Sequence, residues 1–340
     1  MRRGMTRILI RGDGVAARCC AHLLVRAGCP VAVQPSSRPR LPAIMLSEPA
    51  QQLIGDIFER PGLFRHLPSI RYRIVAWAAD ADPVVLDHSA VVVSEEFLLD
   101  GLGPLPESSQ CADAAWTVCA SAPLPTEATE HRFGSRIACT ARVELSNSAE
   151  ATACWIESLA DGWLFLIGDA PATGWLLSVG LHPESLLDQS TMIRSRVARA
   201  HPPTAHFPAT PRLGVPLGGR GWIACGTAAM AFDPLCGDGT AHAVREAILA
   251  SAVIQAAMRG GDVDALLSHY ETRLTSAFHR HLMHCHQYYS SGRGGPWWQA
   301  EAGAAARGIE WCSGRLGADP KFRFRLNGLQ LEAVSCGRKW

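Results

Sequence analysis

The chain has 340 residues, of which 48% are hydrophobic and 19% are charged, and this composition is typical of a globular protein with a well-buried core. Its 32 basic and 31 acidic residues give a net charge of +1, so charge provides no reason to expect nucleic acid or an anionic membrane as a partner. The length predicts two domains, or one domain with a large insertion.

The cysteines and the apolar runs predict a protein of the reducing cytoplasm. None of the 12 cysteines forms a C-x-x-C pair, and several lie in apolar stretches where a thiol behaves as a small hydrophobe. The apolar run at residues 8–10 is too short for a signal-peptide core. No run reaches about 18 apolar residues, the length that a membrane helix requires, so we expect no membrane span.

The N-terminal segment predicts a strand, a tight glycine turn, a helix and a second strand. The first strand covers residues 7–11, the helix covers residues 15–27 and ends at Gly28, and the second strand covers residues 31–33. This order is the first βαβ unit of a Rossmann-like parallel sheet.

The turn has the pattern G-x-G-x-x-A, which is typical of a dinucleotide site. Glycines allow the tight turn and let backbone amides approach a pyrophosphate, while the start of the helix supplies partial positive charge. Gln34 stands where an acidic residue would bind the ribose hydroxyls, and it can still hydrogen-bond. The cofactor-binding residues predicted here are Gly12, Gly14, Val15, Ala16, Ala17 and Gln34.

The middle of the chain predicts a sheet-based cap over the cofactor domain. A Ser/Pro/Arg loop at residues 35–42 leads to a helix at residues 48–60, and residues 121–211 read mainly as antiparallel strands. Further strands are predicted at residues 72–77, 89–93, 116–120, 136–145, 153–158, 162–167, 175–179 and 222–226, with a short helix at residues 95–101.

A second glycine-rich loop follows the strand at residues 222–226 and leads into a long helix at residues 239–258. Pro234 stiffens this loop, while Gly237 and Gly239 allow close backbone approach. The dipole of the following helix would stabilise negative charge at its start. An ordinary helix-capping turn is the alternative interpretation.

The two loops together resemble FAD-dependent monooxygenases and the tryptophan-halogenase-like flavoproteins. In that superfamily a G-D-A-A segment contacts the ribityl chain and pyrophosphate, and the following loop faces the flavin pyrimidine; here Thr227 replaces the aspartate. The resemblance implies FAD as cofactor. It also implies a second set of cofactor-binding residues: Gly226, Asp233, Pro234, Gly237, Asp238, Gly239 and Thr240.

The same resemblance disfavours halogenation. The segment from Gly162 to Gly168 is similar to the halogenase G-W-x-W-x-I-P strand, but Phe165 and Gly168 break the motif. The halogenase lysine has no counterpart because the first lysine is Lys321, and Asp238 would place a carboxylate near a halide. Hydroxylation through a flavin C4a-hydroperoxide is the chemistry that remains. The chain has no clear D-G motif of the NADPH-coupled aromatic hydroxylases, so a separate flavin reductase is the expected electron source.

The C-terminal part predicts helices with clustered histidines and aromatic residues. His281 would share a helix face with His284 or Cys285, but no second ligand pair is evident nearby, so we expect no metal site. The aromatic residues at positions 288–289, 297–298 and 311 either line a substrate cavity or form plain core. A last strand is predicted at residues 322–331.

The sequence therefore predicts an α/β fold: a discontinuous Rossmann-like FAD-binding domain, an inserted mixed-sheet substrate cap and a helical C-terminal segment. The FAD domain would comprise residues 1–35, 90–125 and 212–260, the cap residues 36–89 and 126–211, and the C-terminal segment residues 261–340. The expected substrate is an aromatic small molecule or a polypeptide, such as a protein-bound tryptophan during maturation of a quinone cofactor. The alternatives are another flavin-dependent oxidoreductase acting on small molecules, including one of the geranylgeranyl-reductase type, and a non-catalytic FAD-binding protein.

Overall fold

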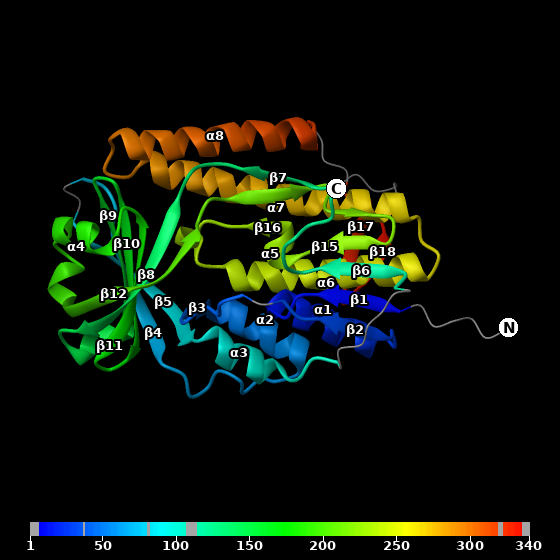
Figure 1. The fold of residues 1–340 in the computed structure, drawn as a ribbon, viewed down its shortest axis with the longest axis horizontal. Coiled ribbons are helices and arrows are strands. Elements are labelled where there is room, and N and C mark those ends of the chain that lie inside the picture. The colour runs from blue at the N-terminus through cyan, green and yellow to red at the C-terminus, as the bar shows by residue number, and fades with distance from the viewer. Residues whose placement is uncertain (1–6, 37, 80–81, 107–113, 319–321, 335–340) are drawn as a thin grey trace.

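The computed structural model describes residues 7–36, 38–79, 82–106, 114–318 and 322–334. Two large sheets lie toward opposite ends of an elongated molecule, and long helices run beside them (Figure 1). The five-stranded sheet has the order β14-β15-β6-β1-β2. Its strands are β1 (Ile8–Arg11), β2 (Val31–Gln34), β6 (Trp116–Cys119), β14 (Gly218–Gly219) and β15 (Trp222–Ala224).

The centre of this sheet is parallel. β1 pairs in parallel with β2 and β6, and β6 pairs in parallel with β15. Ile8 and Ile10 are fully buried, as expected for a parallel sheet that is covered on both faces. Because the strands are parallel, the turns after β1, β2, β6 and β15 meet at one edge of the sheet. The predicted Rossmann-like unit is confirmed.

The eight-stranded sheet is mixed and has the order β12-β8-β11-β10-β9-β4-β5-β3. β4 is parallel to β9, and the other neighbours are antiparallel. Its strands precede and follow β6 in the chain, which matches the predicted inserted, mixed sheet. They are β3 (Ile44–Ser47), β4 (Ser69–Ala76), β5 (Val84–Val93), β8 (Ile137–Leu145), β9 (Ala153–Leu159), β10 (Gly162–Ala170), β11 (Thr173–Gly180) and β12 (Val197–Pro208).

Helices cover the five-stranded sheet and connect it to the mixed sheet. In Figure 1, α1, α2 and α3 lie on one side of the molecule and α7 and α8 lie along the other. The helices are α1 (Val15–Arg26), α2 (Glu48–Phe58), α3 (Glu95–Leu102), α4 (Pro183–Gln189), α5 (Gly226–Ala229), α6 (Gly239–Met258), α7 (Val263–Ser290) and α8 (Pro296–Leu316). No helix in the described part of the chain is long and apolar enough to cross a bilayer.

Short elements complete the fold. A three-stranded sheet contains β7 (Thr129–Arg132), β13 (Arg212–Val215) and β16 (Met230–Ala231), and three 3-10 turns are η1 (Ser148–Thr152), η2 (Arg194–Arg196) and η3 (Pro234–Cys236).

The predicted single strand at residues 322–331 is wrong. The structure has a hairpin there, formed by β17 (Phe324–Asn327) and β18 (Gln330–Ala333). Gly328 has a φ of +56°, which lets the chain reverse direction in the middle of the predicted strand.

Candidate functional site

The first glycine loop connects β1 to α1 at the carboxyl edge of the parallel sheet. Gly12 has a φ of +123° and its amide donates to the Gln34 carbonyl at 2.8 Å, so the loop is fixed against the end of β2. Gly14 is the residue before α1, and among the described residues no side chain caps this helix start. The first amides of α1 can therefore bind an anion.

The second glycine loop approaches the first loop directly. A Cβ atom on Gly226 would lie 2.6 Å from Cβ of Ala16, in the first turn of α1. A Cβ atom on Gly12 would lie 3.1 Å from Oγ of Ser121, in the turn after β6. The structure thus brings together, at one edge of the sheet, turns that are far apart in the sequence. Binding of a single FAD by both glycine loops requires this arrangement.

Two arginines that the sequence analysis did not single out lie beside the first loop. Arg38 Nη1 donates to Glu95 at 2.9 Å, and Nη2 of the same side chain lies 3.1 Å from where a Cβ of Gly14 would be. Arg40 pairs with Asp13, the residue between the two glycines. Both arginines come from the Ser/Pro/Arg loop after β2, whose composition marks a surface loop but not the direction of its side chains.

The start of α6 lies against the mixed sheet. Gly237 has a φ of +64°, and a Cβ there would be 3.6 Å from Nη2 of Arg73 and 3.9 Å from Cε of Met45. A Cβ on Gly239 would meet open space. The carboxylate of Asp238, the residue before α6, pairs with Arg245 within this helix at 2.8 Å. The loop therefore faces the space between the two sheets.

Asp233 lies in a buried ionic network. Its Oδ2 lies 2.8 Å from Nε of Arg136, and Arg136 Nη1 donates to Glu301 at 2.8 Å; the Arg136 and Asp233 side chains have no exposed area. The Tyr289 hydroxyl also donates to Asp233 at 2.8 Å, and Leu235 donates its amide to the other carboxylate oxygen at 2.9 Å. Burial raises the pKa of Asp233, and the neighbouring Arg136 acts in the opposite direction. The carboxylate of Asp233 therefore fixes the loop to α7, and the Asp233 amide adds a second contact to this helix by donating to His281 Nε2 at 2.8 Å.

Glu246 on α6 lies behind the second glycine loop. Its carboxyl accepts a hydrogen bond from the Gly226 amide at 2.7 Å, and the residue is buried. Burial raises the pKa of Glu246 to about 8, so this carboxyl is mostly protonated at neutral pH.

This raised pKa gives the first testable prediction. From the ordinary value of 4.5 to about 8, the unfolded chain loses the Glu246 proton while the folded chain keeps it, so wild-type stability falls as pH rises through this window. The carboxamide of a Glu246→Gln variant keeps an acceptor for the Gly226 amide and does not titrate. The variant should therefore gain stability relative to wild type between pH 5 and pH 8, by up to a few kcal/mol. Unfolding midpoints at several pH values measure this difference, and a constant difference would contradict the assignment.

Most of the predicted aromatic residues form a cluster between α7, α8 and the mixed sheet. Trp163 donates its indole N–H to the Tyr289 hydroxyl at 3.1 Å, and Trp77 lies 5.4 Å from Trp298 between ring centroids. Tyr289 and Trp298 are buried core residues, whereas Trp77 is half-buried. The cluster packs on Leu235 and Cys236 of η3, next to Gly237.

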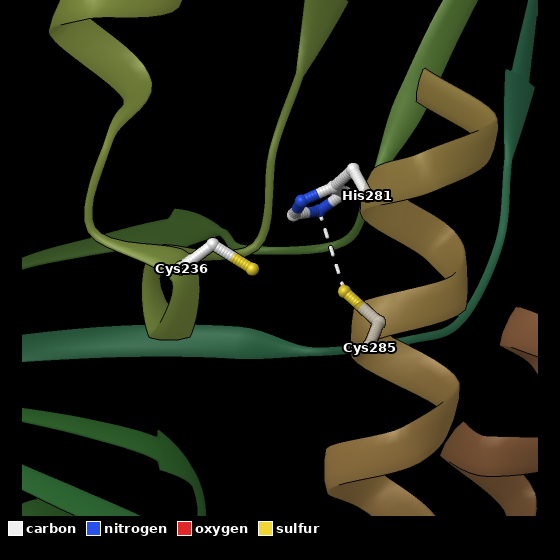
Figure 2. A group of neighbouring side chains, drawn as sticks. All are labelled: Cys236, His281 and Cys285. Carbon is white, nitrogen blue, oxygen red and sulfur yellow. Dashed lines mark hydrogen bonds between the residues drawn. The ribbon is translucent and has the colours of Figure 1, made fainter. Parts of the chain in front are cut away.

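η3 also brings Cys236 to the histidine-rich face of α7. Sγ of Cys285 lies 3.3 Å from Nε2 of His281, and Sγ of Cys236 points toward both groups (Figure 2). Burial lowers the pKa of His281 to about 3, and its Nε2 accepts a hydrogen bond from the Asp233 amide at 2.8 Å. His284 is exposed, so of the two pairs considered from the sequence only His281 and Cys285 lie together in the interior.

A cavity of about 1200 Å³ lies elsewhere, between α6, α7 and the C-terminal hairpin. Its lining includes Glu246, His269, Arg273 and Phe324, and in the described part of the chain it includes no glycine of the two loops. Glu246 therefore lies between this cavity and the second glycine loop, from whose Gly226 amide it accepts a hydrogen bond.

Comparison with known proteins supports the same fold. No protein-family model matches the chain, and no curated protein matches its sequence. Among solved structures, the chain is similar to the peptidyl tryptophan dihydroxylase QhpG, described as essential for tryptophylquinone cofactor biogenesis, with a TM-score of 0.72 and 18% identity over 97% of this chain and 86% of that one.

Two further structures show the same likeness. The flavin-dependent halogenase CmlS has a TM-score of 0.71 and 16% identity over 91% of this chain and 70% of that one. The p-nitrophenol 4-monooxygenase PnpA from Pseudomonas putida DLL-E4 has a TM-score of 0.66 and 14% identity over 94% and 96% of the two chains. The chain thus has the fold of flavin-dependent monooxygenases and halogenases, and the resemblance predicted from its sequence is confirmed at the level of the fold.

Proposed function

We propose that the chain is an FAD-dependent monooxygenase that hydroxylates an aromatic substrate. The observation that carries this proposal is the approach of Gly226 to Ala16, which places the second glycine loop against the start of α1 at the carboxyl edge of the parallel sheet. In open α/β sheets this edge is where cofactors bind.

The residues at this edge fit FAD. Gly12, Gly14 and Gly226 leave their Cβ positions vacant, and the start of α1 offers amides to the pyrophosphate. Arg38 and Arg40, each paired with a carboxylate, would offer their remaining guanidinium N–H groups to the phosphates. Gln34, which is exposed at the end of β2, would hydrogen-bond the ribose.

The second loop would hold the flavin end of the cofactor. The backbone of residues 233–240, with Gly237 and Gly239, lies between α6 and the mixed sheet, and the α6 dipole favours negative charge at that point. Thr227 Oγ1 donates to the Ala120 carbonyl at 3.3 Å, so its side chain supports the turn after β6, where an aspartate of the superfamily would contact the ribityl chain. Bound FAD supplies the redox chemistry and the activation of molecular oxygen.

The chain's own residues would bind and orient the substrate and exclude water from it. Trp77, Phe165 and Trp297 are partly buried members of the cluster that includes Leu235 and Cys236 of η3, so they offer flat apolar surfaces on the same side of the molecule as this turn. An aromatic ring suits such a surface better than a charged or highly polar substrate.

Hydroxylation is favoured over halogenation by the lysine content. The chain contains only Lys321 and Lys339, both outside the described residues, so no lysine precedes the cap as it does in the halogenases that the sequence resembles. A polypeptide substrate with a reactive tryptophan is the second candidate, and the similarity to QhpG over 97% of this chain favours it.

We expect the purified protein to bind one FAD per chain. Reduced by dithionite or by a flavin reductase, it should then transfer one atom of ¹⁸O₂ to an aromatic acceptor, which mass spectrometry of the product detects. Panels of small phenols and indoles, and of tryptophan-containing peptides, separate the two substrate classes. Protein that takes up no FAD would contradict the whole proposal, whereas FAD binding with oxygen uptake but no labelled product would contradict only the monooxygenase step.

A further inference from the structure

We propose that Cys236, His281 and Cys285 form a binding site for a zinc ion, independently of FAD. The residues come from two elements that are distant in the sequence: Cys236 ends η3, while His281 and Cys285 lie one turn apart on α7. One ligand atom from each residue lies within 4.8 Å of the other two (Figure 2).

The spacing of these atoms is close to that of a zinc site. With Zn–S near 2.3 Å and Zn–N near 2.0 Å, tetrahedral coordination separates the ligand atoms by about 3.5–3.8 Å. The sulfur of Cys285 and Nε2 of His281 are already 3.3 Å apart. Small rotations of the Cys236 and Cys285 side chains would therefore close the triangle around an ion.

Donor chemistry and charge select zinc. Two thiols and one imidazole are soft or intermediate ligands, unsuited to Mg²⁺ or Ca²⁺. Binding would release the two thiol protons to solvent, so that Zn²⁺ with two thiolates is neutral, which suits a buried site. A monovalent copper ion would leave one negative charge beside Asp233, which already lies in a buried ionic network.

The fourth coordination position would be filled by water. Asp233 cannot take it without losing its contacts, because its carboxylate oxygens already bind the Leu235 amide, the Tyr289 hydroxyl and Arg136. Cys236 is half-buried, so an ion and a water molecule can reach the site from its side.

Zinc binding would alter the contact between η3 and α7. The Nε2 lone pair of His281 now accepts the Asp233 amide at 2.8 Å, and a zinc ion would use the same lone pair. The Asp233 amide must then find another acceptor, so binding requires a small movement of η3. Since η3 leads directly into Gly237, the ion would also adjust the second glycine loop.

Cobalt(II) binding to the full chain tests the site. Protein purified with a thiol reductant and stripped with EDTA should bind one Co²⁺ with a sulfur-to-cobalt charge-transfer absorption band, and Zn²⁺ should displace it. The Cys236→Ser variant should lose about half of the band and bind Co²⁺ at least about tenfold more weakly. Loss of a residue that only hydrogen-bonds a metal ligand already lowers metal affinity by about tenfold or more, and loss of a ligand should lower it at least as much.

Cys29→Ser is the matched control, because Cys29 is also half-buried but lies at the end of α1, away from the cluster; this variant should keep the full band. Circular dichroism verifies that each variant is folded. The proposal is overturned if reduced wild-type protein binds no Co²⁺ through sulfur, or if Cys236→Ser and Cys285→Ser bind it as wild type does. Both outcomes are measured from the cobalt absorption band, without FAD and without an activity assay.

Discussion

A Gly14→Val variant should fold normally and lose FAD affinity by about a hundredfold or more. Gly14 has a φ of −73° and a ψ of −174°, an extended conformation that valine adopts readily. The added Cβ would contact only flexible atoms, chiefly Nη2 of Arg38 at 3.1 Å. The branched side chain would, however, stand where the pyrophosphate must approach the first amides of α1.

The size of the effect follows from those amide contacts. A hydrogen bond to a charged group contributes about 1.5–3 kcal/mol, and losing two of them corresponds to roughly a hundredfold or more in Kd. Fluorescence titration with FAD measures the affinity, and thermal unfolding of the apoprotein reports on the fold.

Gly314→Val is the matched control, since Gly314 lies on α8 and its Cβ position has no atom within 4 Å apart from its chain neighbours and the backbone of its own helix. This control should bind FAD as wild type does. Equal FAD affinity in the Gly14→Val variant and wild type would show that the first loop does not bind the cofactor.

Local patterns were sufficient to predict the parallel unit and the long helix of the second loop. The alternation of apolar strands with the G-x-G-x-x-A turn predicted β1, α1 and β2, and α6 spans Gly239–Met258 as expected. These elements depend on the periodicity of the apolar residues and on the glycines of the turn, both of which can be read from residues close together in the sequence. The meeting of Gly226 with Ala16 followed from the resemblance and from the rule that parallel strands end at one edge.

Long-range side-chain contacts could not be predicted in the same way. Arg38 and Arg40 appeared only as members of a polar loop, because nothing in that loop shows which side chains turn toward the glycines. The partner of His281 and Cys285 was sought nearby in the sequence, yet Cys236 lies in another element and reaches them only through the fold.

The buried network around Asp233 was also beyond the sequence. The resemblance assigned Asp233 to the cofactor loop, and the structure shows that its carboxylate binds Arg136 and Tyr289. No pattern in the sequence around Arg136 indicates these partners. Arg136, the residue before β8 of the mixed sheet, pairs with Asp233 of the second loop and with Glu301 of α8. The network therefore connects the mixed sheet, the second loop and the C-terminal helices.

An Arg136→Met variant should therefore lose about 3–5 kcal/mol of unfolding free energy, because it leaves the carboxylates of Asp233 and Glu301 buried without their cation. Without the arginine, the pKa of Asp233 should rise further, since Arg136 now opposes the effect of burial. The unfolded chain would then lose this proton at lower pH than the folded one, so the loss of stability should grow as pH rises from about 4 to 7. Urea unfolding at several pH values measures both effects.

Two further variants test whether the lost stability comes from the buried network rather than from the removal of any arginine. Arg220 pairs with Asp264 at 3.5 Å with side chains 86% and 74% exposed, so Arg220→Met should change stability by less than about 1 kcal/mol. Adding Asp233→Asn and Glu301→Gln to Arg136→Met removes the uncompensated charges and should recover part of the lost stability, since a buried ionic group costs most when only one partner is removed. The combined variant would be less stable than Arg136→Met alone only if the carboxylates act mainly as hydrogen-bond acceptors. That result would contradict charge compensation as the interaction that joins the segments of Arg136, Asp233 and Glu301.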